Sequence, residues 1–146
     1  MSKLVIVLAS AVALSAQAQD NKAEKLNMEL VGYSDLQGRS AYQPTIHKQG
    51  ERWIAYVGHH GDNVLNPLTG NKEDNGTSII DVTDPTQPRY LAHIPGQPGL
   101  AEAGGAQMVR VCDGAQLPKA DKSKVYLLRT FGNREHQLWN VTDPRT

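Results

Sequence analysis

The residues best suited to chemistry lie in the run Gly58-His59-His60-Gly61-Asp62. Imidazole nitrogens and a carboxylate oxygen are ligands that zinc and iron accept, so His59, His60 and Asp62 form a candidate metal site. Adjacent residues of a strand point to opposite faces, so only one of the two histidines reaches a shared site unless the glycines bend the chain. No H-E-x-x-H or paired C-x-x-C spacing is present. The competing interpretation is a polar loop with ordinary hydrogen-bonded histidines.

The segment that follows, up to Gly76, is rich in side-chain oxygen, which calcium prefers. The residues concerned are Asp62, Asn63, Asn66, Asn71, Glu73, Asp74 and Asn75. They do not follow the D-x-[DN]-x-[DN]-G order of a calcium-binding loop. A solvated loop with a tight turn at Asn75-Gly76 explains the same composition. A divalent metal is therefore the one cofactor that the sequence suggests, and its identity stays open.

Other catalytic signatures are absent from the sequence. No serine stands in G-x-S-x-G, and the glycine-rich residues 99–106 lack the lysine of a phosphate-binding loop, which favours a linker. Cys112 is the only cysteine, so the visible chain holds no disulfide. We expect a buried free thiol in the strand 108–112, the alternative being a partner in sequence beyond this chain.

A repeat dominates the organisation of the chain. The phrase Ser78-Ile-Ile-Asp-Val-Thr-Asp-Pro85 returns as Gln137-Leu-Trp-Asn-Val-Thr-Asp-Pro144. In each copy the aspartate before proline can accept a backbone N–H two residues on, while proline presets the φ angle of a turn. The phrase therefore predicts a strand that runs into a tight corner.

Further strands precede each corner, and β-branched and aromatic residues dominate them. Four strand types recur in one order, over 29–38 and 89–99, 43–47 and 107–111, 52–57 and 124–129, and 78–85 and 137–144. No long stretch keeps a helical apolar period. We predict an all-β fold of antiparallel four-stranded repeats, about 28–85 and 89–146, typical of roughly two blades of a β-propeller.

The two strand-and-corner phrases resemble the LVIVD repeat, over roughly residues 28–146. Asn140 stands where the pattern usually has an acidic residue. The resemblance implies an exported bacterial β-propeller and carries no catalytic residues over. Two repeats cannot close a ring, so we expect the chain to be a fragment that is incomplete at its C-terminus. Residues 28–34 would then complete a blade whose other strands lie further along the chain.

The N-terminus predicts export. Residues 1–18 combine Lys3, an apolar stretch and a small-x-small cleavage site, as in a secretory signal peptide, with a linker over 19–27. The apolar stretch is too short for a membrane span. Without it the chain has 14 basic and 15 acidic residues, which excludes a nucleic-acid footprint. A periplasmic or secreted location follows.

The sequence favours a binding or scaffold module over an enzyme. Loops of unequal length on a repeated scaffold are where such proteins hold a small-molecule ligand or a protein partner. The alternative is a metal-dependent periplasmic hydrolase or oxidoreductase with His59, His60 and Asp62 as ligands.

Overall fold

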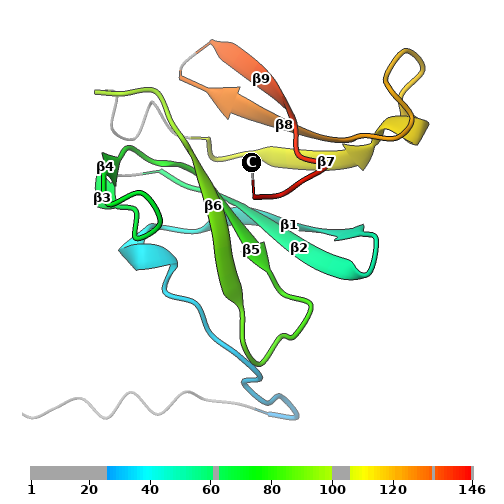
Figure 1. Ribbon diagram of the computed structural model, residues 1–146. Helices are drawn as coiled ribbons and strands as arrows, with labels where there is room; N and C mark the ends of the chain where they lie inside the picture. The colour runs from blue at the N-terminus through cyan, green and yellow to red at the C-terminus, as the bar shows by residue number, and fades with distance from the viewer. Residues whose placement is uncertain (1–25, 61–62, 100–105, 133, 146) are drawn as a thin grey trace, which may run out of the picture.

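The computed structural model describes residues 26–60, 63–99, 106–132 and 134–145, and the signal-peptide prediction lies outside them. Nine strands follow one another along these described ranges (Figure 1). They are β1 (Tyr42–Gln49), β2 (Arg52–Gly58), β3 (Val64–Leu65), β4 (Lys72–Glu73), β5 (Gly76–Asp81), β6 (Arg89–Pro95), β7 (Val109–Asp113), β8 (Val125–Phe131) and β9 (Glu135–Asn140). Two 3₁₀ turns, Leu36–Gly38 and Gly114–Gln116, complete the described elements.

The strands form two antiparallel sheets and one hairpin. The first sheet has the order β1-β2-β5-β6, the second sheet β7-β8-β9, and β3 pairs with β4. The prediction of an all-β antiparallel fold is confirmed. Within the described ranges, no helix has the length and apolarity that a membrane crossing requires.

The sheets do not coincide with the sequence repeats. Strand β6, placed at the start of the second repeat, is hydrogen-bonded to β5 and so belongs to the first sheet. The strand expected over 29–34 is wrong, because residues 27–35 have no strand structure. The second sheet consequently has three strands in the described part of the chain instead of four. Each sheet is offset by one strand from the repeat because a repeat pattern has no intrinsic starting point.

The two Asp-Pro corners have the predicted mechanism. Oδ1 of Asp84 accepts the backbone N–H of Thr86 at 3.0 Å, and Oδ1 of Asp143 accepts that of Arg145 at 3.1 Å. The threonine of each phrase also ties its corner to the neighbouring strand of the sheet, β2 in the first copy and β8 in the second. Thr83 Oγ1 accepts the N–H of Trp53 at 2.9 Å, and the second copy repeats this contact. The polar residues of the repeated sequence thus make the hydrogen bonds that end one strand and hold it to the sheet.

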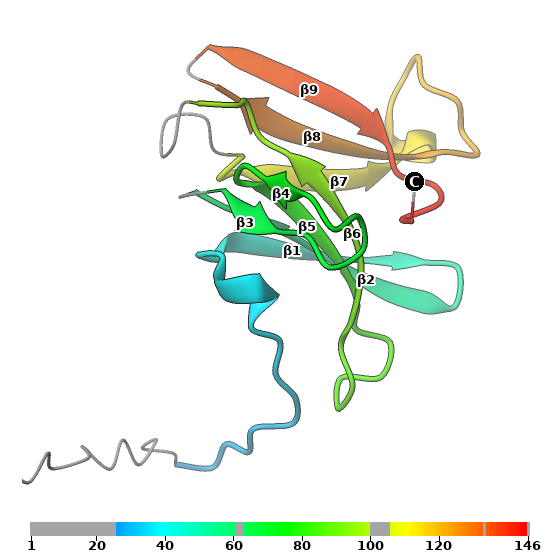
Figure 2. The same ribbon diagram turned by 60° about the vertical axis from the view of Figure 1, so that its left-hand side comes forward.

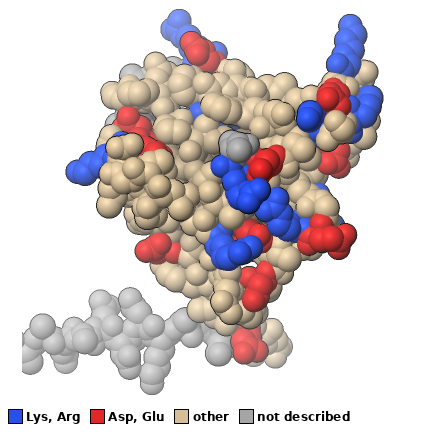
Figure 3. Space-filling model, viewed as in Figure 1, with Lys and Arg blue, Asp and Glu red and all other residues tan. Residues whose placement is uncertain are grey.

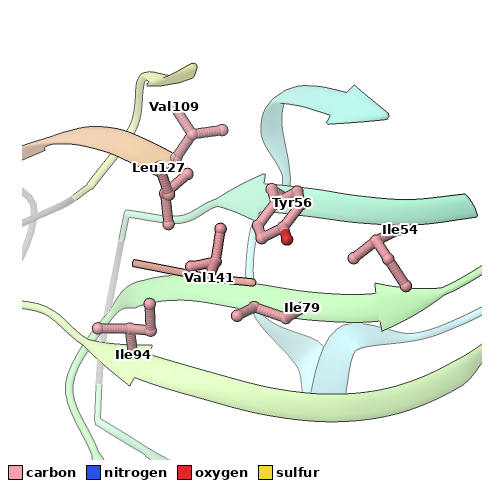
Figure 4. Close-up of a cluster of buried hydrophobic side chains, with 7 residues drawn as sticks. All are labelled: Ile54, Tyr56, Ile79, Ile94, Val109, Leu127 and Val141. Atoms are coloured by element: carbon pink, nitrogen blue, oxygen red, sulfur yellow. The ribbon is translucent and has the colours of Figure 1, made fainter. Parts of the chain in front are cut away.

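The main core lies between the two sheets, which pack face to face (Figure 4). The first sheet supplies four residues, the second sheet two and the corner after β9 one, listed in chain order as Ile54, Tyr56, Ile79, Ile94, Val109, Leu127 and Val141. Residues of one face alternate with those of the other, so Ala55, Val57 and Ile80 point to the opposite face. Leu36 of the N-terminal segment covers that outer face. Figures 1 and 2 both show this segment and the second sheet on opposite sides of the first sheet.

A buried arginine joins the two sheets at one end of this core. Arg129 on β8 donates from Nη1 to the carbonyl of Ile94 at 2.7 Å and from Nη2 to that of Pro95 at 2.6 Å. Its Nε and Nη2 also donate to Oε1 of Gln137. The guanidinium carbon lies 5.6 Å from the ring centroid of Trp139, a distance at which a cation and an aromatic ring attract each other. Arg129 therefore holds the edge strand of the first sheet to the second.

We expect Ile79→Val to lower the free energy of unfolding by about 1 kcal/mol, because Ile79 is fully buried in the main core. The matched control is Ile46→Val, since the side chain of Ile46 is 59% exposed on β1. Chemical denaturation of both variants measures the difference. Equal losses would contradict the assignment of this face to the core.

Candidate functional site

Six polar side chains gather on the outer face of the first sheet, the face opposite the main core, and we call them the polar cluster. They are Arg39, His59, Glu73, Ser78, Tyr90 and His93. Strands β5 and β6 supply Ser78, Tyr90 and His93, and Ser78 is the cross-strand partner of His93. The N-terminal segment and the β3–β4 hairpin cover them from the other side through Arg39 and Glu73.

His59 uses both ring nitrogens within the fold. Nδ1 lies 2.6 Å from the carbonyl oxygen of Ser40, which can only accept, so Nδ1 carries the proton. Nε2 then accepts from the hydroxyl of Ser78 at 2.7 Å. Burial is the main cause that lowers the pKa of His59 to about 4, and the charge of Arg39 adds to it, while the Ser40 contact opposes it. His59 is a neutral, fully satisfied imidazole with no nitrogen left for a metal.

His93 forms the second half of the cluster. Its Nδ1 donates to Oε2 of Glu73 at 2.7 Å, and its Nε2 is buried without a hydrogen-bond partner among the described residues. Burial lowers the pKa of His93 to about 4, against the opposing effect of the Glu73 contact. A proton on Nε2 would have no acceptor and would stand near the guanidinium of Arg39. The imidazole is therefore neutral at pH 7.

Glu73 fastens the hairpin to the sheet. Burial acts to raise the pKa of its carboxyl, but hydrogen bonds from His93, Asn66 and Thr69 outweigh it and lower that pKa. Asn66 Nδ2 and Thr69 Oγ1 each lie 2.9 Å from a Glu73 oxygen. The oxygen-rich loop thus directs two of its expected calcium ligands, Asn66 and Glu73, at each other.

The predicted metal ligands do not converge where they are described. His60 packs edge-on against the ring of Tyr42, with centroids 5.1 Å apart, and its carbonyl accepts from the Ser40 hydroxyl. Asp62 lies outside the described residues. In the ranges that the structure describes, no group of three His, Cys, Asp or Glu side chains is placed to hold a metal ion. The imidazole of His93 lies beside that of His59, with ring centroids 6.2 Å apart.

The hydrogen bond between Ser78 and His59 is the pairing of a nucleophile with a general base. Both side chains are completely buried, however, and the imidazole is oriented by a backbone carbonyl instead of a carboxylate. No substrate could reach the hydroxyl without displacing the covering hairpin. The pair therefore serves the fold. Sequence reasoning missed Ser78, and it placed Glu73 only among the oxygen ligands of the loop, because the relation of both residues to the histidines depends on strand pairing.

An open groove lies beside the cluster, along the edge strand β6. We call it the edge groove, a cavity of about 360 Å³. Its lining comes from the β3–β4 hairpin, from β6 and from the second sheet, namely Asn66, Leu68, Thr69, Leu91, Ala92, His93, Ile94, Pro95, Trp139 and Arg145. Leu68 and Trp139 are exposed large apolar side chains, and Arg145 is a cation at the same groove. This volume and mixture of side chains fit a small ligand or a peptide side chain.

Cys112 is a free, half-buried thiol on β7, opposite Tyr126 of β8. Tyr126 is its cross-strand neighbour, and Cys112 lies in neither the polar cluster nor the edge groove.

Comparison with protein-family models, with curated proteins and with solved structures returned no match. The resemblance to LVIVD repeats accordingly stays a prediction from the residues, and the function has to be argued from the geometry alone.

Proposed function

We propose that this chain is an exported binding module built on propeller-type repeats of the LVIVD kind, and that the edge groove holds its ligand. The observation that supports the proposal is the convergence of three separate parts of the chain on one apolar, partly polar groove of about 360 Å³. The hydrogen bond from His93 to Glu73 ties the hairpin that forms one wall of that groove to β6, and Asn66 and Thr69 of the same wall bind Glu73 in turn. Periplasmic or secreted placement remains part of the proposal.

The chemistry of the groove favours a ligand with an aromatic or aliphatic body and an anionic end. Leu68 and Trp139 offer apolar surface, and Arg145 offers a guanidinium whose side chain is 65% exposed despite its contact with Asp143. Elsewhere, on the face seen in Figure 3, basic and acidic side chains are interspersed. No single-sign patch on that face competes with the groove for a nucleic acid or a charged surface.

Aromatic carboxylates are the probes that test this proposal. In a Trp53→Phe background the remaining tryptophan is Trp139, so its fluorescence reports on the groove. We expect at least one such probe to change this fluorescence saturably, and Leu68→Glu, which puts a carboxylate into the groove, to weaken its binding about tenfold or more. Leu65→Glu is the matched control, because Leu65 is equally exposed on β3 and does not line the groove.

Failure of every probe to bind, or equal weakening by both glutamate variants, would contradict the groove as a ligand site. His59 gives no support to the alternative of a metal-dependent enzyme, because both of its ring nitrogens are engaged in hydrogen bonds. Elemental analysis of the purified protein, with and without His60→Ala, is the separate test of that alternative.

A further inference from the structure

The edge groove lies beside strand β6 and not over one face of the sheet. Five consecutive residues of β6, 91–95, line it. Successive residues of a strand point to opposite faces, and here Ile94 belongs to the main core while His93 belongs to the polar cluster on the other face. A cavity lined by residues of both faces runs along the edge of the strand, where the main chain is the surface. Strand β6 is the last strand in the order of the first sheet, so this edge pairs with no further strand in the described ranges.

The register of the sheet shows which main-chain groups of β6 face the groove. In an antiparallel pair, the N–H and C=O of one residue point to the same side, and those of its two neighbours point to the other side. The carbonyl of Gly76 accepts the N–H of His59 at 2.8 Å, on the β2 side of β5. The next residue, Thr77, therefore points to β6, where Ile94 is its partner. His93 precedes Ile94, so the N–H and C=O of His93 point away from β5 and toward the groove.

The carbonyl of Pro95 agrees with this direction and limits the length of the free edge. Pro95 lies two residues after His93, and Nη2 of Arg129 in the second sheet donates to its carbonyl at 2.6 Å. At the other end, the register of β5 and β6 shifts, and Leu91 has no partner in β5. Between these two points His93 offers one donor and one acceptor. An antiparallel strand uses such a pair of groups to bind a single residue of its neighbour.

The other walls of the groove fit a side chain and a chain end. Leu68 of the β3–β4 hairpin and Trp139 of β9 line the same cavity with large apolar side chains. Arg145 adds a guanidinium, which can bind a carboxylate through two hydrogen bonds. A main-chain edge, an apolar pocket and a site for a terminal carboxylate are the contacts through which proteins bind short extended peptides.

We propose that the ligand of the edge groove is a short extended peptide that pairs with the main chain of His93 and places its C-terminal carboxylate at Arg145. An apolar side chain of the peptide packs on Leu68 and Trp139. The inference rests on the proposed function and narrows its ligand class, because a simple aromatic carboxylate has no N–H and C=O pair to offer the edge. Main-chain pairing is the same for every residue type, so the site selects an extended shape, one apolar side chain and a carboxylate.

The test compares the peptide N-acetyl-Ala-Phe-Ala, with a free carboxylate, with phenylpropionate, an aromatic carboxylate that has no peptide main chain. The fluorescence of Trp139 in the Trp53→Phe chain reports the binding of both. We expect the peptide to bind at least about tenfold more tightly, and phenylpropionate to compete with it. Arg145→Met should weaken binding of the peptide about fivefold and should not weaken binding of the same peptide as its C-terminal amide.

Methylation of single peptide nitrogens tests the pairing itself. Successive N–H groups of an extended peptide point to opposite sides, so a methyl group that faces β6 should weaken binding about tenfold or more, and one on a neighbouring nitrogen should have little effect. Equal effects at every nitrogen, no gain over phenylpropionate, or no loss with Arg145→Met would each overturn the peptide proposal and leave the groove as a site for aromatic carboxylates. If neither probe binds, or if Leu68→Glu weakens neither, the proposed function is overturned as well.

Discussion

Acidification from pH 7 to pH 5 is expected to lower the free energy of unfolding by about 4 kcal/mol, about 2 kcal/mol from each histidine of the polar cluster. The pKa values of His59 and His93 are about 4 in the folded chain, against an ordinary value of 6.5. The unfolded chain therefore binds more protons across this window, and stability falls as pH falls. Below pH 4 both states are protonated and the histidine effect is complete.

Chemical denaturation at several pH values measures this slope, and the window above pH 5 separates it from the titration of carboxylates. His59→Gln and His93→Gln are informative variants, because glutamine offers a donor and an acceptor but does not titrate. Each should remove about half of the pH dependence. His136→Gln is the matched control, since His136 is exposed on β9. A slope that survives in the double variant would mean that other groups carry it.

Replacement of Arg129 by methionine is expected to lower the free energy of unfolding by about 3 kcal/mol, from two opposing effects. Burial lowers the pKa of Arg129 from 12.5 to about 10, so removal of its charge regains about 3 kcal/mol of desolvation. The lost charged hydrogen bonds to Ile94, Pro95 and Gln137 together outweigh this, at roughly 2 kcal/mol each. The carbonyls of Ile94 and Pro95 lose the donors that Arg129 supplies, and β6 is no longer tied to the second sheet at this end of the core.

Arg110→Met is the control for Arg129→Met, because Arg110 is exposed on the neighbouring strand β7 and donates to the carbonyl of Val109 beside it. We expect its effect to stay within about 0.5 kcal/mol. Denaturant titration of both variants measures the difference. Arg129→Lys should fall between them, since an ammonium keeps the charge but cannot span three acceptors. A neutral Arg129→Met variant would show that desolvation dominates at this position.

The features that the sequence predicted well depend on neighbours along the chain. Asp84 and Asp143 make the turn contacts expected of them because the accepted N–H lies two residues away. Strands β1, β2, β5, β7 and β8 lie where β-branched and aromatic runs predicted them, and β6 is correctly a strand but belongs to the first sheet. Residues 29–34 have the pattern of a strand, but a pattern does not supply the partner that a strand needs.

The site depended on contacts between distant segments, which a single sequence does not reveal. His59 has a metal-ligating side chain, yet Ser40 and Ser78, each 19 residues away, take its two nitrogens. Nothing in the sequence indicated the role of Arg129, because that role depends on the carbonyls of Ile94 and Pro95, more than 30 residues earlier. Asp62 remains a prediction outside the described residues.

The one-strand offset between sequence repeat and sheet has a consequence for how such a chain lengthens or shortens. A duplication of one sixty-residue repeat copies parts of two sheets, so the new unit interlocks with its neighbours instead of standing beside them. Conversely, a break at the corner after Pro85 would separate β6 from β5 and strip the first sheet of its outer strand. The boundaries of the sequence repeats and the boundaries of the sheets therefore lie in different places, so a cut between two repeats does not fall between two sheets.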